Sequence, residues 1–379
     1  MPCWWLYHLF YSHISGETEK IMLNLLRKRW WKFVSVAFLL VALVAGMYFP
    51  LSSGITAVGP EKATEGQTLS LAITTYNTNF ENNKVPKVYL RGNELFFCAN
   101  AVTILSPVNL TAVFNIPDSL GINGTKPFNV VIDDAVGGTF FLRSAVVLAG
   151  SNPSNGATHT CAKDLEIHAS ANMSYPYREI LYESIRNLFY HVPLWFAMLL
   201  LLVCSFGSSI AYLNSNNMLY DVFAKEAAFV AMLFGALGIV TGMTWANFTW
   251  GTPWTNDPKL NGAAVGMLTY LAYFVLRGSL TQRDQRAKVS AVYGIFAFII
   301  YIIFIFVLPR LSDSLHPGNG GNPAFSNYDL DNRLRPVFYA AVIGFTGIGY
   351  WIMSLRIRYT LLLEKQQEQI DTPYESMVS

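Results

Sequence analysis

The stretch VSAVYGIFAFIIYIIFIFVL, residues 289–308, runs for twenty residues without Asp, Glu, Lys or Arg. A helix of about 20 apolar residues is long enough to cross the roughly 30 Å hydrocarbon core of a bilayer. Lipid offers no hydrogen-bond partners to the backbone, so the chain must satisfy its own, as a helix does. This stretch therefore predicts a transmembrane helix.

Five further uncharged stretches have a similar length. The six predicted spans are Phe33–Ser52, Val192–Leu213, Ala227–Trp245, Leu260–Leu276, Val289–Leu308 and Pro336–Leu355. The composition agrees, because 53% of the residues are hydrophobic and only 13% are charged, against about 25% charged in a typical soluble domain. We expect an all-α polytopic membrane protein with six transmembrane helices. The net charge of +2 provides no bulk basic field for nucleic acid.

Lys and Arg near the ends of the spans predict the orientation, because they concentrate on the cytoplasmic side. Three basic segments lie before the first span, between the fourth and fifth, and after the sixth. They contain Arg27, Lys28, Arg29 and Lys32, then Arg277, Arg283, Arg286 and Lys288, then Arg356, Arg358 and Lys365. Six spans place all three on one side. We therefore predict a cytoplasmic segment 1–32, whose true start is expected at Met22, and a cytoplasmic tail 356–379, although Arg310, Arg333 and Arg335 fall on the opposite side.

Residues 55–172 have a different character. Short runs of alternating or β-branched residues, such as TLSLAITTY (68–76) and KVYLR (87–91), are separated by turn signals such as GING and NPSNG. Strands at this spacing are typical of a β-sandwich. We expect a small β-sandwich domain inserted between spans one and two, outside the membrane, where a spacer or docking role is the default interpretation.

The cysteines form no CxxC pair, which argues against thiol redox or zinc chemistry. Cys98 and Cys161 both lie in the predicted β region, and an oxidising compartment would permit a disulfide between them. Paired and unpaired states are both open at this point. Cys204 lies in an apolar span and is expected to be a packed small side chain. Residues 177–190 have helical apolar spacing and predict an amphipathic helix at the outer interface.

The outer loop between spans three and four is rich in tryptophan. Trp245, Trp250 and Trp254 occur within ten residues, followed by Asp257 and Lys259. An aromatic belt at headgroup level is the ordinary interpretation of such residues. However, their concentration in a compact turn with Gly251 and Pro253 also suits a flat, conjugated ligand, which indole rings can stack on. Asp257 would add a hydrogen-bond acceptor and Lys259 a cation for ligand carboxylates.

Two histidines fall on the same side as this loop. His191 opens span two at its outer end, and His316 lies in the loop after span five. Neutral imidazole is a common metal ligand and an axial ligand of haem iron. Each histidine alone is more simply an interfacial side chain, but the shared side favours a pair of ligands. The sequence contains no P-loop, GxSxG or HExxH motif, which argues against nucleotide hydrolysis and against these hydrolase classes.

The tryptophan segment resembles the WWD motif of CcmC-type haem-handling proteins in cytochrome c biogenesis, in the superfamily of CcmC, CcmF and CcsA. Their pattern W-x4-WGTWW-x-WD-x-RL corresponds here to W-x4-WGTPW-T-ND-P-KL. Seven positions match: Trp245, Trp250, Gly251, Thr252, Trp254, Asp257 and Leu260. Lys259 replaces an arginine, and Pro253 and Asn256 replace tryptophans. The family segment His-Val-Pro-x-x-Trp is similar to His191-Val192-Pro193-Leu194-Trp195.

The resemblance implies a five-helix haem-handling membrane domain over 177–355, with the tryptophan-rich loop at 245–260. It implies haem b with His191 and His316 as axial ligands, and contacts from Trp245, Trp250, Trp254, Asp257 and Lys259. It further implies a periplasmic site in the bacterial inner (plasma) membrane, a CcmE-like haem chaperone that receives the haem, and CcmA-like and CcmB-like ABC transporter subunits.

Three hypotheses follow. The first is a haem-delivering subunit that is not itself an enzyme. The second is a haem lyase component of the CcsA or CcmF type, which attaches haem to apocytochrome c. The third is a haem-free transporter or scaffold, in which the tryptophans only anchor the chain at the interface. An absorption spectrum and the co-purifying partners distinguish the three.

Overall fold

The computed structural model describes residues 29–80, 85–92, 95–120, 122, 124–150, 167–168, 173–179, 181–312, 314–316 and 330–378. The chain divides into two compact units. The first, here the membrane unit, comprises Met1–Met47 and Arg186–Ser379. The second, here the β unit, comprises Tyr48–Ile185 and is inserted into the first.

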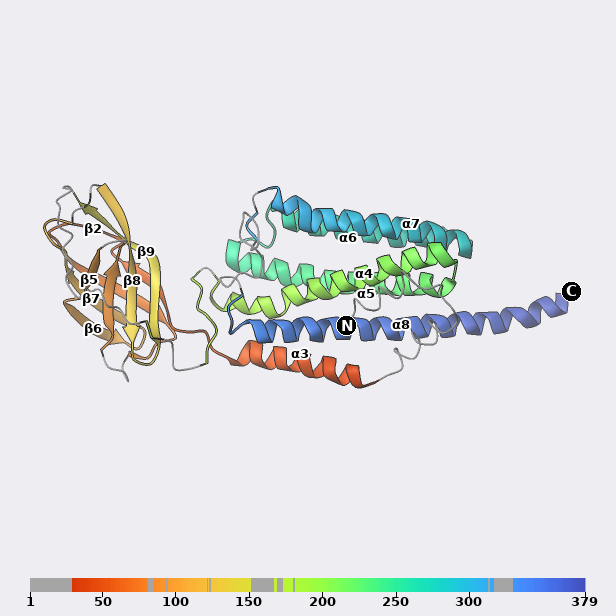
Figure 1. The fold of residues 1–379 in the computed structure, drawn as a ribbon, viewed down its shortest axis with the longest axis horizontal. Helices are drawn as coiled ribbons and strands as arrows, with labels where there is room; N and C mark the ends of the chain where they lie inside the picture. Colours follow the sequence, from red (N-terminus) through yellow and green to blue (C-terminus); the bar gives the residue numbers. More distant parts are fainter. Residues whose placement is uncertain are drawn as a thin grey trace. The chain divides into compact units, whose positions relative to one another are not determined.

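The membrane unit is helical, and its helices run side by side (Figure 1). They are α3 (Trp30–Tyr48), α4 (His191–Ser215), α5 (Met218–Trp250), α6 (Pro258–Ser279), α7 (Arg283–Ile302) and α8 (Arg335–Val378). A 3-10 segment, η2 (Tyr182–Phe189), precedes α4, and a π-helical segment, η3 (Ile303–Val307), and a short η4 (Leu308–Arg310) extend α7. Six of these helical stretches are long and apolar enough to cross a membrane. The prediction of a polytopic α-helical membrane protein is confirmed.

The helices differ in length from the predicted spans. The first ends at Tyr48 rather than Ser52, because the residue before Pro50 disfavours helical backbone. Helix α5 starts at Met218 rather than Ala227, and α8 continues for 44 residues. These extensions carry charged side chains, so a prediction from hydropathy alone leaves them out of the spans. Ion pairs stabilise the charges in the helices, as in the contact of Glu226 with Arg356 (2.6 Å).

Small residues allow close helix packing within the membrane unit. A Cβ at Gly344 or Gly347 of α8 would collide with α3, at 2.7 Å from the backbone N of Leu39 or with the Ser35 hydroxyl. On α5, Gly235 and Gly238 face Met198 and Trp195 of α4 in the same way. Close backbone approach through small residues is the usual mode of helix association in membranes. These glycines therefore permit the close packing of α3 on α8 and of α4 on α5.

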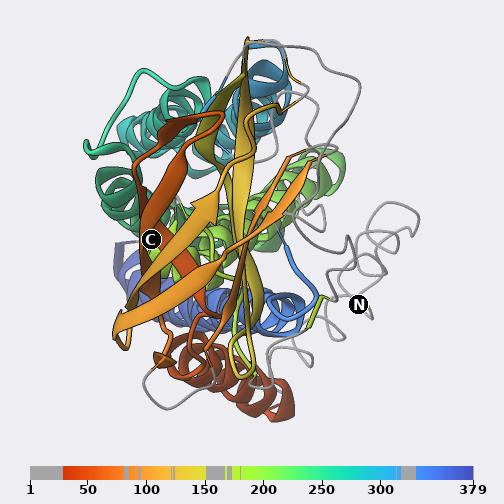
Figure 2. The ribbon, with the colours of Figure 1, turned by 90° about the vertical axis from the view of Figure 1, so that its left-hand side faces the viewer.

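The described residues of the β unit form nine strands, which the sequence predicted in part. They are β1 (Gly54–Gly59), β2 (Lys62–Thr64), β3 (Thr68–Tyr76), β4 (Lys87–Arg91), β5 (Phe96–Cys98), β6 (Ala101–Ser106), β7 (Asn109–Asn115), β8 (Gly124–Asp134) and β9 (Gly138–Gly150). They form a four-stranded sheet, β1-β3-β7-β6, and a five-stranded sheet, β2-β9-β8-β4-β5 (Figure 2). All pairs are antiparallel except β2 with β9.

One apolar core joins the two sheets of the β unit. Alternate residues of β3 are buried, as expected for a strand with one face on a core. Leu71 of β3 and Phe114 of β7 lie in the same cluster as Val130 of β8 and Leu148 of β9. Both sheets are open, with β1 and β6 as edges of one and β2 and β5 as edges of the other. The unit is therefore two open sheets over a shared core.

The structure bears on the predictions made for Cys98, Cys161 and Cys204. Cys98, at the end of β5, is disulfide-bonded, and Cys161, its expected partner, lies outside the described residues. Cys204 is a free thiol, half-buried against the core of the membrane unit. Its expected role as a packed small side chain is confirmed.

Candidate functional site

His191 is the first residue of α4 and lies against the second half of α5. Its Nδ1 is 3.0 Å from the carbonyl oxygen of Gly238 and 3.1 Å from the hydroxyl of Thr241. A carbonyl oxygen only accepts hydrogen bonds, so Nδ1 must carry the proton of the neutral ring. The lone pair is then on Nε2, the nitrogen that a metal would take.

The local sequence of α5 makes this position possible. Gly242 follows Gly238 by one helical turn, and a Cβ at Gly242 would lie 2.7 Å from Cε1 of His191. Thr241 donates its own hydroxyl proton to carbonyl groups one turn earlier, at 2.9 Å from Leu237. Its oxygen is therefore oriented to accept from the imidazole. The helix thus provides a space for the ring and two acceptors for one of its nitrogens.

Asp257 organises the opposite half of the site. It caps the N-terminus of α6, where one carboxylate oxygen accepts the backbone N–H groups of Lys259 (2.9 Å) and Leu260 (3.3 Å). The other accepts the Ser314 hydroxyl and the Leu315 N–H, both at 2.8 Å. The residue is only 3% exposed. A single carboxylate therefore ties the start of α6 to the segment 314–316.

The same carboxylate holds His316, whose Nδ1 lies 3.0 Å from Oδ1 of Asp257. Burial raises the pKa of Asp257, but hydrogen bonds from Ser314 and Leu315 and the proximity of His316 outweigh it and leave the pKa lowered. An ionised carboxylate can only accept, so Nδ1 of His316 donates and the lone pair again lies on Nε2.

His316 is neutral in this setting. Its side chain is 15% exposed, and burial lowers its pKa to about 4, against the weaker opposing attraction of Asp257. The positive charge of Lys259 also contributes to the lowering. The contact with Asp257 is consequently a hydrogen bond from a neutral ring at physiological pH. Carboxylate groups orient metal-binding histidines in this manner in many proteins.

Two of the three tryptophans pack around His316. The ring centroid of Trp250 lies 5.1 Å from that of His316, and the centroid of Trp245 lies 6.1 Å away. The two indoles contact each other edge-on at 5.0 Å. Gly251 ends α5 with a φ of 75°, a left-handed conformation that glycine adopts without strain. This turn folds the loop back so that the tryptophans and the 314–316 segment meet.

The remaining predicted residues, Trp254 and Lys259, have fewer contacts with the histidines. Trp254 is 37% exposed, and in the described part of the chain no ring contact joins it to either histidine. Lys259 lies in the first turn of α6, within electrostatic range of His316. His191 and His316 also lie within range of each other's charge. All seven predicted residues therefore belong to one end of the membrane unit. They lie at the starts of α4 and α6, in the last two turns of α5 and the loop that follows it, and after α7.

Sequence reasoning missed four residues that position the histidines: Gly238, Thr241, Gly242 and Ser314. The pair Gly238–Gly242 has the small-xxx-small spacing that marks close helix contacts in membranes, so this signal was present. Ser314 carries no such pattern. It is found only through its hydrogen bond to Asp257, 57 positions away in the sequence.

Part of this chain is similar in sequence to known proteins. Residues 169–316 match the family described as Cytochrome C assembly protein, a range that contains both histidines. The chain is 24% identical over 188 residues to a putative ccmC-like mitochondrial cytochrome c biosynthesis protein of Marchantia polymorpha, covering 49% of this chain and 79% of that protein.

Two bacterial relatives add to this comparison. The chain is 22% identical over 178 residues to heme exporter protein C of Rhodobacter capsulatus, covering 47% of this chain and 72% of the relative. A cytochrome c biogenesis protein CcsA of Prochlorococcus marinus is 31% identical over 96 residues, which is 25% of this chain and 30% of that protein. These matches span both the exporter branch and the CcsA branch.

Proposed function

Because this chain belongs to the cytochrome c biogenesis family of heme exporter protein C and CcsA, we propose that it holds haem b between His191 and His316 and delivers it to a haem chaperone. Its general role is haem handling in cytochrome c maturation. The proposal adds the ligands, the haem type and the recipient, which would be a CcmE-like chaperone working beside CcmA-like and CcmB-like ABC transporter subunits.

One observation carries the proposal: in both histidines Nδ1 faces an oxygen that can only accept, which leaves the lone pair on Nε2. A structural site for a bare zinc ion needs four protein ligands, and among the described residues no group of three or more His, Cys, Asp and Glu side chains is placed to hold an ion. Haem needs only two axial ligands, because the porphyrin provides the other four nitrogens. The residues present therefore fit haem iron better than a bare metal.

The surrounding side chains have distinct proposed roles. Trp245 and Trp250 pack on His316 and would provide an apolar wall for the porphyrin, which Trp254 extends at the exposed edge of the loop. Lys259 would pair with a haem propionate. Asp257 acts through His316, as a positioning residue, because its oxygens are already engaged by α6 and by segment 314–316.

The placement in the cell is part of the proposal. The basic segments favour N- and C-termini in the cytoplasm, and the haem end would then lie at the periplasmic face of a bacterial inner membrane. The predicted domain at residues 55–172, which lies within the β unit, would then be a periplasmic β-sandwich. The membrane unit at 177–355 would handle the haem, and the tail 356–379 would be cytoplasmic.

An absorption spectrum of the detergent-purified full-length protein tests the ligands. We expect the low-spin spectrum of bis-histidine haem in the unaltered protein, and its loss in His191→Ala and in His316→Ala. His168→Ala is the matched control, since His168 lies in the β unit, where it contacts Asp133. A colourless protein that takes up no added haem would support the haem-free scaffold, and a normal spectrum in His316→Ala would eliminate the second ligand.

The CcsA-named relatives keep a second function open, because a haem lyase would use the same ligands. The two functions differ in the proteins that the chain would bind. A delivery subunit is expected to co-purify with a small haem chaperone and ABC transporter subunits, whereas a lyase component is expected to retain apocytochrome c. Affinity purification of the intact protein from its membrane, with identification of the bound chains, decides between them.

A further inference from the structure

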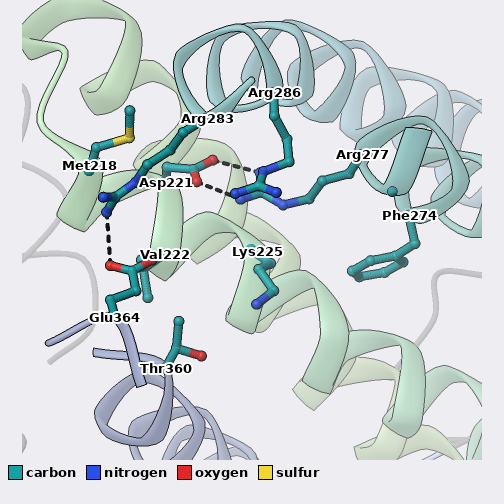
Figure 3. Close-up of a pocket in the computed structure, with 11 residues that line it drawn as sticks. Met218, Asp221, Val222, Lys225, Phe274, Arg277, Arg283, Arg286, Thr360 and Glu364 are labelled. Carbon is teal, nitrogen blue, oxygen red and sulfur yellow. Dashed lines mark hydrogen bonds and ion pairs between the residues drawn. The ribbon is translucent and has the colours of Figure 1, made fainter. Parts of the chain in front are cut away.

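A second site lies at the end of the membrane unit opposite the histidines. A cavity of about 310 Å³ is formed by the first two turns of α5, the last turn of α6, the first turn of α7 and the middle of α8. Its charged lining residues are Lys225, Arg277, Arg283, Arg286, Asp221 and Glu364 (Figure 3). The proposed haem function uses none of them.

The charges of this cavity do not cancel. Arg277 forms a bidentate ion pair with Asp221, and Arg283 pairs with Glu364 at 2.9 Å. Lys225 contacts Glu226 at 2.9 Å, but that carboxylate is shared with Arg356. Four cations and two carboxylates therefore line the cavity, which leaves an excess of positive charge for a ligand.

Of the four cations, Arg286 contributes most clearly to this excess of positive charge. It is half-buried on α7, and within the described ranges no hydrogen bond or ion pair joins it to another side chain. Figure 3 shows its side chain extending toward the Asp221–Arg277 pair at the edge of the cavity. A guanidinium group presents several N–H donors in a planar fork that matches phosphate and carboxylate oxygens. Arg286 is therefore placed to bind an anionic oxygen group.

Apolar side chains extend from the cavity along α5. Phe274 lines it, and the ring of Phe229 packs edge-on against Phe274 at 6.0 Å. Phe229 is 44% exposed and begins an exposed row with Leu233 and Leu237, at successive helical turns of α5. A ligand held here would have its charged part among the arginines and its apolar part along this row.

We infer that the cavity binds the phosphate headgroup of an anionic phospholipid, whose acyl chains lie along Phe229, Leu233 and Leu237. Basic pockets between transmembrane helices are suited to such headgroups. The charged residues lie at the ends of the spanning helices, which is the depth of lipid phosphate. The volume is at the lower limit of ligand cavities, about 300–1,000 Å³, which suits a headgroup rather than a whole porphyrin.

Lipid titrations of the detergent-purified protein, followed by native mass spectrometry, test this inference. Phosphatidylglycerol and phosphatidylcholine with identical acyl chains are compared. We expect phosphatidylglycerol to bind more tightly, and Arg286→Gln to weaken it about fivefold, the effect of one basic residue near a membrane surface. Phosphatidylcholine binding should be unchanged in this variant. Lys288→Gln, which removes an exposed cation two residues away on the same helix, should match the unaltered protein.

Several results would overturn the inference. Equal binding of the two lipids, or an unchanged phosphatidylglycerol affinity in Arg286→Gln, would exclude a headgroup site. An equal loss in Lys288→Gln would indicate general surface charge. Displacement of phosphatidylglycerol by haem would reassign the cavity to propionates, and displacement by inorganic phosphate would reassign it to a soluble anion. The haem spectrum of Arg286→Gln is measured separately. A failure of the lipid proposal can therefore be distinguished from a failure of the haem proposal.

Discussion

Asp257 is the residue on which the interactions at the histidine end converge. It accepts hydrogen bonds from the start of α6, from Ser314 and from Leu315, and it sets the tautomer of His316. These contacts make the carboxylate a structural anchor and a positioning group at the same time. A buried carboxylate with this many donors is stabilised in its charged form, so the orientation of His316 does not depend on pH near neutrality.

We predict that Asp257→Asn weakens haem binding about 10- to 100-fold, the usual cost of removing an outer-shell partner of a metal ligand. Asparagine can still cap α6 and face His316 with a carbonyl oxygen in the place of Oδ1, but that oxygen is neutral. Its amide group, in the place of Oδ2, donates, so Ser314 and Leu315 lose their acceptor. Haem titration followed at the Soret band measures the change. Asp331→Asn is the control, because Asp331 accepts from the Arg333 N–H without touching a histidine, and an equal loss there would argue against the positioning role.

The pH dependence follows from the lowered pKa of His316. In the folded chain burial brings it to about 4 from an ordinary value of 6.5, so between these two values the unfolded state binds more protons than the folded state. The free energy of unfolding must then fall as the pH falls from about 6.5 to about 4. Asp257, whose pKa is depressed, adds its own loss only below its ordinary value of 3.8.

Thermal unfolding of the haem-free protein in detergent measures this dependence. We expect the unfolding temperature to decrease across pH 6.5 to 4, and the decrease to be smaller in His316→Gln, which has no group titrating there. Equal slopes in both proteins would show that His316 is not buried as a neutral ring.

At the scale of the elements, the contact between α4 and α5 determines where His191 lies. Gly238 accommodates Trp195, and Gly242 accommodates the imidazole of His191. The backbone of α5 approaches so closely that its own carbonyl at Gly238 becomes the partner of the histidine. A helix with larger residues at these two positions would hold α4 farther away and would offer Nδ1 no acceptor.

Gly242→Ala is accordingly expected to displace the His191 ring, because the new Cβ would lie 2.7 Å from Cε1. We predict loss of the low-spin haem spectrum while membrane insertion, assessed by yield and gel filtration, is retained. Gly278→Ala provides the matched control, since a Cβ at this helical glycine meets nothing within 4 Å. A normal spectrum in Gly242→Ala would show that the imidazole can move without losing its ligand position.

At the scale of the whole molecule, the candidate haem residues and the β unit belong to different parts of the chain. All seven predicted site residues lie in the membrane unit. The β unit has its own apolar core, and the two segments that connect it are hydrogen-bonded to each other, with the Ser52 N–H 2.7 Å from the Tyr175 carbonyl oxygen. The insertion therefore begins and ends at nearly the same point, as is typical of tolerated domain insertions.

Excision of residues 54–173, with a short Gly-Ser linker in their place, is predicted to leave the haem spectrum intact. The reason is that the ends to be joined are already adjacent and no proposed ligand is removed. Spectra of the shortened and full-length proteins are compared after purification in the same detergent. If the shortened protein inserts and elutes normally but binds no haem, the β unit must contribute to the site, which would contradict the separation of roles.

Most residues of the candidate site could be proposed from the sequence because their signals are local. The tryptophan cluster, the two histidines on one side and Asp257 are all legible from residue types and from the order of the spans. It did not predict that Asp257 serves His316, that Trp254 is exposed away from both histidines in the described structure, or that charged turns extend α5 beyond the apolar span. The first and the last of these depend on contacts between residues more than fifty positions apart, namely His316 with Asp257 and Arg277 with Asp221.

The sequence by itself determined the number of apolar stretches long enough to span a membrane, several strands of the inserted region and the shared end of the bundle where the histidines lie. These follow from the length of apolar runs and from alternation, since burial in lipid or in a sheet core acts on each segment separately. Only the tertiary structure decided which nitrogen of each histidine carries the proton and which arginine is left with surplus charge. Hydrogen-bond direction and charge balance are set by groups that helix packing brings together, and no single segment contains both partners.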